Sequence, residues 1–343
     1  MDKKLSRRKV GRTSCEVSVL GMGGAPLGNL FEVLPDELAL ATVEAAYKAG
    51  VGHFDMAPQY GHGVAEHRFG SILRTKPRDS FTLSTKVGRL LKSAKSHEIK
   101  RGNWKSTLEF NIVHDYTYDA VMRSIEDSYQ RLGMNRIDIA LIHDVDVAHH
   151  GDDYDARFKE AIEGAVPALQ ELRRAGIIKA IGIGVNEVGP SVQFAKNADL
   201  DCYMLAGRYS LLEQDGLDEL FPLAEKQGFS FLIAGPYKSG ILATGATPGA
   251  THDYRAAPPE VVEKVNRLSA ICARHNTPLA AAAVQFPLGQ PRVASVVTGA
   301  VRAHEIEQNV ELMAHKIPAD LWRELRAEGL LSEAAPVPEG PFA

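Results

Sequence analysis

The sequence predicts a single (β/α)8 barrel of the TIM type that spans residues 1–343, with a β-hairpin before the barrel and long loops at its carboxyl-terminal face. Three observations predict this fold. Eight short apolar runs alternate with amphipathic stretches of helical period, several of these stretches end at a glycine, and polar residues follow the apolar runs. Repeated strand–helix units build parallel sheets, and eight units close a barrel whose reactive side chains lie at the carboxyl ends of the strands.

The hairpin and the strands are expected where short apolar runs are bounded by turn residues. Residues 7–16 predict the hairpin, with Gly11-Arg12 as the turn between two short arms. The eight barrel strands are expected at Val17–Leu20, His53–Met56, Phe81–Lys86, Ile137–His143, Ile178–Val185, Asp201–Leu205, Ser230–Ile233 and Ala294–Val297. The early glycines in residues 21–24 do not complete the G-x-G-x-x-G pattern of an open dinucleotide-binding sheet, so that alternative is the weaker one.

Helices are expected where apolar residues recur at helical spacing between a start signal and a glycine or proline stop. One helix is expected to begin near Val64. The others are expected at Asp36–Ala49, Tyr118–Leu132, Phe158–Ala175, Leu217–Gln227 and Glu260–Arg274.

Composition and charge are those of an ordinary globular protein. The chain has 45% hydrophobic and 24% charged residues, and its net charge of −4 argues against nucleic acid as a partner. The longest nearly apolar stretch, Leu279–Leu288, is too short to cross a membrane, and no apolar signal segment follows the basic Met1–Arg12. Cys15, Cys202 and Cys272 are odd in number and widely spaced, which is typical of a reduced cytoplasmic protein. No heptad repeat marks an interface, so a monomer or weak homo-oligomer is expected.

Four reactive side chains stand at or just beyond three successive predicted strand ends. Asp55 ends the second strand, and Tyr60 follows it in a loop with proline and glycine. Lys86 ends the third strand and His143 ends the fourth. Taken singly, each residue has an ordinary structural explanation as a cap, a packing aromatic, a surface cation or a core histidine. Together, at one end of a predicted barrel, this strand-end cluster indicates a catalytic site.

The strand-end cluster suits proton transfer to or from an alcohol or carbonyl, coupled with hydride transfer. A lysine ammonium about 4 Å from a phenol favours the phenolate by up to ~4 kcal/mol at an effective dielectric near 20. Lys86 is therefore expected to bring the pKa of Tyr60 toward about 7, where acid–base catalysis is most effective. Asp55 is expected to keep Lys86 charged, and His143 to orient the reacting oxygen. The cluster lacks the nucleophile–base pair that acyl transfer needs.

No metal site is expected. The sequence contains no Cys-x-x-Cys or His-Glu-x-x-His spacing. The run from His143 to Asp155 holds further histidines and aspartates, but their irregular spacing favours a solvated polar loop over a metal cluster. Within this run, Asp144 and Asp146 are expected to hydrogen-bond near the site.

The segments around the strand-end cluster resemble motifs of the aldo-keto reductase superfamily. They are FDMAPQYG at 54–61, with Glu66 and Gly70 beyond it, TKVG at 85–88 and LIHD at 141–144, in the order of that family. The likeness runs from Arg7 to about Leu325. It implies a (β/α)8 barrel that binds a nicotinamide cofactor, with Tyr60 as the acid–base residue, Lys86 and Asp55 tuning it, and His143 orienting the substrate.

Further segments are similar to one branch of this superfamily, the L-fucose or D-threo-aldose 1-dehydrogenases together with pyridoxal 4-dehydrogenase. They are DYTYD at 115–119, GIGVNE at 182–187, MLAGRY at 204–209 and GPYKSG at 235–240. This likeness implies a small-molecule substrate and favours oxidation of an aldose at C1 to its lactone. The alternatives are a pyridoxal 4-dehydrogenase, a general NADPH-dependent aldehyde or ketone reductase, and a non-catalytic subunit that senses the cofactor.

The resemblance also implies which residues hold the cofactor. Asn186 matches the position that binds the nicotinamide carboxamide, and Gly235, Tyr237, Ser239 and Gly240 match the loop around the pyrophosphate. Around the nicotinamide, this sequence departs from the family pattern in three places. The serine that usually precedes Asn186 is Val185 here. The usual glutamine after the sixth strand and the usual stacking aromatic after the seventh are replaced by small residues, at Ala206 and at Ala234 or Gly235.

The segment after the eighth strand favours NAD, with NADP as the other possibility. NADP-preferring relatives present a lysine and an arginine to the 2′-phosphate, and these positions are Gly299 and Glu305 here. A glutamate repels a phosphate, and only Arg302 supplies a cation nearby. Gln308 and Asn309 are expected near the adenine.

Three connections are longer than a barrel requires, at 89–117, 145–157 and 242–259. They follow the third, fourth and seventh strands, so they are expected to form the walls of the substrate pocket or to close over the cofactor. Trp104 and Tyr254 in these loops, together with Met22 at the first strand, are the candidate substrate-contacting residues.

Overall fold

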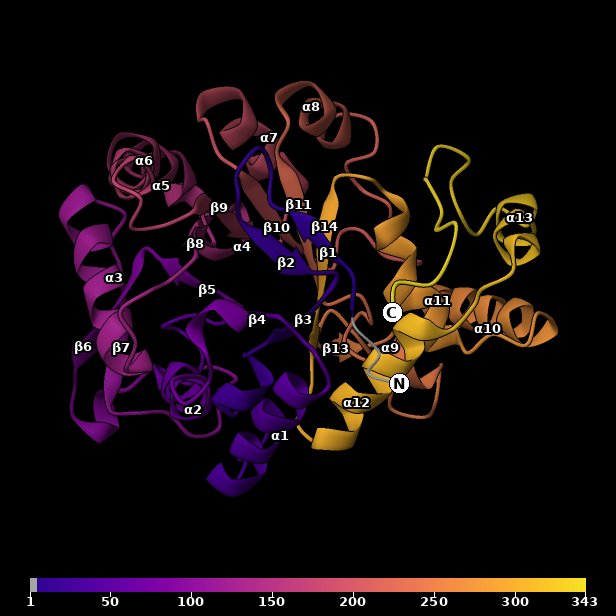
Figure 1. Cartoon of the computed structure of the whole chain (residues 1–343), viewed down its shortest axis with the longest axis horizontal. Coiled ribbons are helices and arrows are strands. Elements are labelled where there is room, and N and C mark those ends of the chain that lie inside the picture. The colour runs from indigo at the N-terminus through magenta and orange to yellow at the C-terminus, as the bar shows by residue number, and fades with distance from the viewer. Residues whose placement is uncertain (1–4) are drawn as a thin grey trace.

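The predicted barrel is present in the computed structural model, which describes residues 5–343 (Figure 1). Eight parallel strands hydrogen-bond in the closed order β10-β11-β14-β3-β4-β5-β8-β9. They are β3 (Leu20–Gly23), β4 (His53–Asp55), β5 (Thr82–Val87), β8 (Ile139–His143), β9 (Ala180–Val185), β10 (Cys202–Ala206), β11 (Ser230–Ala234) and β14 (Val293–Gly299). Because all eight run in the same direction, their carboxyl ends open on one face of the barrel.

Helices surround the strands in Figure 1, the arrangement in which helices bury the outward-facing side chains of a barrel. They are α1 (Asp36–Lys48), α2 (Val64–Leu73), α3 (Tyr118–Leu132), α4 (Val147–His150), α5 (Tyr154–Glu160), α6 (Val166–Arg174), α7 (Val188–Asn197), α8 (Leu220–Gln227), α9 (Ile241–Thr244), α10 (Pro259–Arg274), α11 (Leu279–Gln285), α12 (Ala303–Ala314) and α13 (Ala319–Ala327). The bounds of α3 are those predicted, because Thr117 caps its first turn and Gly133 ends it at a φ of 63°. Between residues 5 and 343, no helix has the length and apolar character needed to span a membrane.

The first barrel strand begins later than predicted. Glu16–Ser18 forms β2, which pairs antiparallel with β1 (Arg7–Lys9), and the barrel starts only at Leu20. The hairpin residues Val10, Cys15 and Val17 pack in one cluster with inward-facing barrel residues. The Gly11 amide also donates to Ser230 Oγ at the start of β11, so the hairpin closes the amino-terminal end of the barrel. The prediction of Val17–Leu20 as a barrel strand was wrong because Val17, Val19 and Leu20 form one apolar stretch in the sequence. Only the pairing partners show that Val17 belongs to the hairpin and Leu20 to the barrel.

The helix predicted at Phe158–Ala175 starts earlier and is interrupted. It begins with α5 at Tyr154, and a π-helical turn at Ala161–Ala165 separates α5 from α6. A Cβ atom on Gly164 in this turn would lie 2.6 Å from the Tyr116 carbonyl oxygen. The turn therefore lies so close to the segment before α3 that only glycine fits there.

The barrel interior near β3 and β4 is small and polar rather than aliphatic. A Cβ atom on Gly21 would lie 2.8 Å from His53 Nδ1, so both residues face the interior. Side chains alternate along a strand, so Asp55 faces inward as well. Phe54, between them, points outward and packs edge-on against the rings of Phe69 and Phe81. This alternation leaves room for polar groups in the centre of the barrel.

The three long connections contain short regular elements. Residues 89–117 hold the antiparallel pair β6 (Arg89–Ser93) and β7 (Phe110–His114), residues 145–157 hold α4, and residues 242–259 hold the small pair β12 (Thr251–His252) and β13 (Arg255–Ala256). Each connection follows the carboxyl end of a barrel strand, so together they build up the face that carries the strand-end cluster.

Candidate active site

Asp55, Lys86 and Tyr60 come together at the carboxyl ends of β4 and β5. The Lys86 ammonium donates to Asp55 Oδ2 at 2.7 Å and to the Met56 carbonyl at 2.9 Å. It also lies 4.9 Å from the centre of the Tyr60 ring. An ammonium carries three N–H groups, so two are used by Asp55 and Met56 and the third remains for the phenol.

The pKa of Tyr60 does not follow the expectation from the sequence. Burial raises the pKa of Tyr60 to about 12, although the nearby Lys86 ammonium acts in the opposite direction. The expected value near neutrality was wrong because two free energies were compared incorrectly. Transfer of the phenolate from water into the protein is more unfavourable than its attraction to the Lys86 ammonium is favourable, since Asp55 already neutralises that ammonium. The phenol is therefore protonated at neutral pH and is set up as a proton donor.

His143 stands beside Tyr60 as a neutral imidazole. The two ring centres are 6.0 Å apart in an edge-on arrangement. Burial lowers the pKa of His143 well below its ordinary value, and the Arg89 and Lys86 cations lower it further. The backbone of His143 is fixed from outside the barrel, because the Tyr116 hydroxyl donates to its carbonyl at 2.8 Å. A neutral imidazole can offer one N–H to an oxygen and one nitrogen lone pair to a donor.

Asp144 connects three strand ends behind the site. Its carboxylate accepts from Arg89 Nη2 at 2.5 Å and from the Asn186 side-chain amide at 3.1 Å. Burial raises the pKa of Asp144, against the opposing effect of Arg89. Because Asn186 uses its amide N–H group on Asp144, its carbonyl oxygen is held at a defined place at the end of β9.

Arg89 was missed by the sequence reasoning. The signal was a cation directly after Gly88, where the β5 motif ends. Most of the run after His143 is exposed, as expected of a solvated loop, but its first two aspartates are not. Asp144 and Asp146 are both buried, and Asp146 Oδ1 accepts from the amide and the ring of His149 at 3.0 and 2.6 Å.

The candidate substrate residues lie in different surroundings. The Trp104 ring lies 5.8 Å from the Tyr60 ring, so the long connection after β5 does reach the strand-end cluster. Tyr254 is 63% exposed and its ring lies 5.3 Å from that of Phe31 at the rim of the face. Met22 is fully buried in the outer core, because it alternates with the inward-facing Gly21, so the structure does not place it at the site.

The segment after β11 has the form of a cradle for a phosphate group. A Cβ atom on Gly240 would meet no atom of residues 5–343 within 4 Å, and one on Gly235 would meet only the Gly207 amide, at 3.9 Å. Lys238 and Ser239 between them also have left-handed backbone, with φ of 47° and 57°. Two small residues beside open space and a tight turn of backbone are suited to the close approach of a pyrophosphate.

Tyr237 and Asn309 are joined behind this cradle. The Tyr237 hydroxyl donates to Asn309 Oδ1 at 2.7 Å, and the Asn309 amide donates to Thr298 Oγ1 at 3.2 Å. Burial raises the pKa of Tyr237. Gln308, the neighbouring candidate, is exposed on α12. The structure therefore places Asn309 inward and Gln308 outward on the same helix.

The start of α12 is already bound by a carboxylate. Glu305 Oε2 accepts from the amides of Val301 and Arg302 at 2.8 and 3.3 Å. Arg302 Nη1 lies 3.7 Å from Glu305 Oε1. Gly299 is required by space, because a Cβ atom there would lie 2.7 Å from the Pro26 ring. The one predicted cation of this segment is thus partly neutralised by its neighbour.

Within residues 5–343, two groups of carboxylates and histidines have the spacing of metal ligands. They are Asp144, Asp146 and His149, and Glu213, His252 and Asp253. Each group already binds a cationic side chain. Arg89 pairs with Asp144, and the buried Lys238 ammonium lies 2.8 Å from Glu213 and 2.7 Å from Asp253. An ammonium or guanidinium supplies the positive charge that such carboxylates require.

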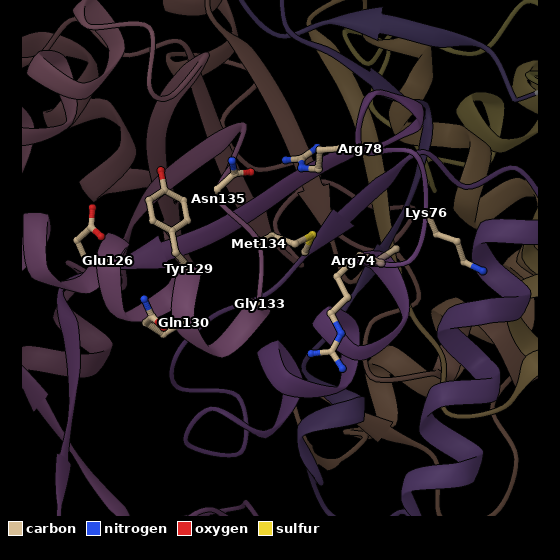
Figure 2. Close-up of a pocket in the computed structure, with 10 residues that line it drawn as sticks. Arg74, Lys76, Arg78, Glu126, Tyr129, Gln130, Gly133, Met134 and Asn135 are labelled. Atoms are coloured by element: carbon tan, nitrogen blue, oxygen red, sulfur yellow. The ribbon is translucent and has the colours of Figure 1, made fainter.

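A cavity of about 690 Å³ opens elsewhere, on the side of the barrel (Figure 2). It lies beyond the ends of α2 and α3, and Arg74, Lys76, Arg78 and Asn135 line it. These residues precede β5 and β8, so the cavity opens near the amino ends of those strands. It is therefore separate from the strand-end cluster, which lies at their carboxyl ends.

Comparison with known proteins agrees with this geometry. Residues 19–328 match the Aldo/keto reductase family. The chain is 42% identical over 341 residues to a pyridoxal 4-dehydrogenase of Microbacterium luteolum, a match that covers 96% of this chain and 99% of the relative. It is 39% identical over 322 residues to a D-threo-aldose 1-dehydrogenase of a Pseudomonas species, covering 92% and 95%.

A solved structure shares the fold. An aldo-keto reductase from Bacillus halodurans superimposes with a TM-score of 0.75 at 22% identity, and the match covers 98% of each chain. The barrel, the converged strand-end cluster and the family match lead to the same assignment. The chain belongs to the aldo/keto reductase family and is an oxidoreductase of that family.

Proposed function

We propose that the enzyme oxidises an aldose at C1 to its lactone, with NAD as the hydride acceptor. The observation that carries this proposal is the convergence of Tyr60 with the Lys86–Asp55 ion pair beside His143. A phenol next to an ammonium transfers protons, and it has no partner that would make it a nucleophile for acyl transfer. The similarity to a D-threo-aldose 1-dehydrogenase over most of both chains supports an aldose as the substrate.

Oxidation of a cyclic aldose removes the hydroxyl proton and the C1 hydride and leaves a C1=O double bond. When bound, the oxidised nicotinamide accepts the hydride and adds a positive charge that favours the phenolate. The Tyr60 oxygen takes the hydroxyl proton, and the third N–H of Lys86 stabilises the phenolate before it does so. Asp55 keeps Lys86 charged, and an N–H of the neutral His143 ring orients the substrate oxygen.

The start of α12 supports NAD over NADP. A phosphate binds well at a helix amino terminus because the amides there are free donors. In this chain the Glu305 carboxylate already accepts from the amides of Val301 and Arg302. A 2′-phosphate would lose these donors and meet a like charge.

A second candidate is oxidation of pyridoxal. Pyridoxal carries a hydroxymethyl group next to its aldehyde and forms a cyclic hemiacetal, so its oxidation gives a lactone by the same proton and hydride steps. The Trp104 ring, 5.8 Å from the Tyr60 ring, offers an aromatic surface to a planar pyridine. The 42% identity to a pyridoxal 4-dehydrogenase supports this candidate as well.

The substrate can be identified from the absorbance of reduced nicotinamide. We expect turnover of at least one of L-fucose, D-arabinose and L-galactose with NAD, and much less with NADP. Turnover of pyridoxal and of no sugar would replace the first candidate by the second. Turnover restricted to aldehyde reduction with NADPH would contradict both, and would identify a general reductase.

Replacing Glu305 by glutamine should weaken the preference for NAD by about tenfold in kcat/KM. The charge that repels a dianionic phosphate is removed, while the glutamine oxygen can still accept from the amides at the start of α12. Kinetics with NAD and NADP in parallel measure the ratio of the two kcat/KM values. Glu307→Gln, on an exposed position of the same helix, is the matched control and should leave it unchanged. An equal ratio in both variants would show that Glu305 does not face the adenosine ribose.

We further propose that the enzyme acts in the reducing cytoplasm as a monomer or weak homo-oligomer. Cys15, Cys202 and Cys272 are all buried free thiols, which is the usual state of cysteines in that compartment. Burial raises the pKa of Cys15 and Cys272 to about 12, so neither is a reactive thiolate at neutral pH.

A further inference from the structure

A line of hydrogen-bonded polar side chains crosses the barrel interior beneath the strand-end cluster. Ser84 Oγ lies 2.7 Å from Asp55 Oδ1, and His53 Nε2 lies 3.1 Å from Ser84 Oγ. On the other side of the ring, His53 Nδ1 lies 3.1 Å from Ser295 Oγ. Ser84, His53 and Ser295 are fully buried, and they come from β5, β4 and β14.

This line is unusual for the inside of a barrel, which is normally filled by branched apolar side chains. Buried hydroxyl and imidazole groups are costly unless each is hydrogen-bonded. Gly21 provides the space for these groups, because a Cβ atom at this position would lie 2.8 Å from His53 Nδ1 and 3.2 Å from Ser295 Oγ. The absence of a side chain at Gly21 and the hydrogen bonds between the polar groups together allow the line to be buried in the barrel.

Counting donors gives the line a single direction. The Asp55 carboxylate only accepts, so the Ser84 hydroxyl must donate to it. The Ser84 oxygen then accepts from His53 Nε2–H. Burial lowers the pKa of His53 to about 4, so the ring carries one proton and its Nδ1 is an acceptor. Nδ1 in turn accepts from the Ser295 hydroxyl, so each of the two hydroxyls and the imidazole N–H donates once along the line.

We propose that His53 and Ser84 are positioning residues for the acid–base reaction of Tyr60, with Ser295 supporting them. They hold the Asp55 carboxylate in one orientation, with Oδ1 bound by Ser84 and Oδ2 bound by Lys86. The Lys86 ammonium is then held by two acceptors, Asp55 Oδ2 and the Met56 carbonyl oxygen. Its third N–H therefore stays directed toward the Tyr60 phenol. This inference rests on the proposed role of the strand-end cluster, whichever substrate is turned over.

Removal of the Ser84 hydroxyl is the most direct test. Ser84→Ala should lower kcat by about tenfold with little change in KM, because the lost hydrogen bond acts on proton transfer rather than on substrate binding. The rise of the oxidation rate with pH should also move to higher pH, since a less ordered Lys86 stabilises the phenolate less. Ser191→Ala, which removes a buried hydroxyl on α7 bonded to its own helix, is the control and should change neither quantity.

A double-mutant cycle separates positioning from packing. In an Asp55→Ala background, Ser84→Ala should lower kcat no further, because the side chain that Ser84 orients is gone. His53→Leu should behave like Ser84→Ala, and His53→Gln should recover part of kcat by restoring an N–H donor. An unchanged kcat and pH profile in Ser84→Ala, with only a lower Tm, would overturn the proposal, as would equal losses in both backgrounds. If His53→Leu fails to fold, Ser84→Ala alone still decides the question.

The outcome is distinguishable from failure of the proposed function. The assay uses any sugar or aldehyde that the wild-type enzyme turns over, in either direction. If Tyr60→Phe retains wild-type activity, the role of the strand-end cluster is wrong. If Tyr60→Phe is inactive and Ser84→Ala is indistinguishable from wild type, only the positioning line is wrong.

Discussion

Replacing Tyr60 by phenylalanine should lower kcat by about 10²–10⁴-fold, the usual contribution of a positioned acid–base group. Phenylalanine keeps the ring that contacts Trp104 and lies against the Lys86 ammonium, so the fold and the pocket shape should be retained. Only the oxygen that exchanges a proton with the substrate is lost. Binding of reduced cofactor, followed by its fluorescence, should be unchanged, which separates a lost reaction from a lost site.

The pH dependence gives a second readout for the same variant. Because burial raises the pKa of Tyr60 to about 12, the phenol is protonated at neutral pH. Oxidation needs the deprotonated form, so its kcat/KM should rise by about tenfold per pH unit until the pKa of the cofactor complex is passed. Reduction uses the protonated form and should stay flat over the same range. In Tyr60→Phe the rise should disappear, and a residual activity with an unchanged pH profile would assign the proton transfer to another group.

Replacing Lys86 by methionine should both abolish turnover and destabilise the protein by about 3–5 kcal/mol, the usual cost of leaving one partner of a buried ion pair alone. Burial opposes the charge on Lys86, but the adjacent Asp55 raises the pKa of the ammonium nonetheless. Without the ammonium, the buried Asp55 carboxylate keeps the Ser84 hydroxyl and loses its counter-charge. Denaturant unfolding with an unchanged m-value measures the loss.

The combination Lys86→Met with Asp55→Asn tests the cause of that loss. Asparagine removes the unpaired charge and can still accept from Ser84, so most of the lost stability should return while turnover stays absent. If the double variant is no more stable than Lys86→Met, the destabilisation comes from repacking around the methionine rather than from the stranded carboxylate.

Much of the fold and the strand-end cluster could be predicted because the signals are local. The short apolar runs, the Thr117 cap and the Gly133 stop act over a few residues, and the structure confirms α3 and the seven barrel strands after the first near their predicted positions. The order of Asp55, Lys86 and His143 at successive strand ends follows from chain connectivity in a parallel barrel. Their convergence is therefore a consequence of the fold class that the sequence predicts.

Other features depend on partners that are distant in sequence. Val17 was assigned to the barrel although it pairs in the hairpin, because an apolar run in the sequence does not indicate with which strand it pairs. Arg89 and Asp144, and likewise His53 and Ser295, lie next to each other only after the barrel closes. Met22 was placed at the site although the alternation with Gly21 directs it into the outer core.

By itself, the sequence determined the fold class, the family and the four residues that meet at the mouth of the barrel, because periodicity and motif order are properties of the chain. Only the tertiary structure decided the electrostatics of those residues. The pKa of Tyr60 lies well above neutrality rather than near it, because burial raises this pKa more than the Lys86 ammonium lowers it. The extent of burial is set by side chains of the whole barrel. The same burial requires the polar line from Asp55 to Ser295, since a charge removed from water is stable only when its hydrogen bonds are complete.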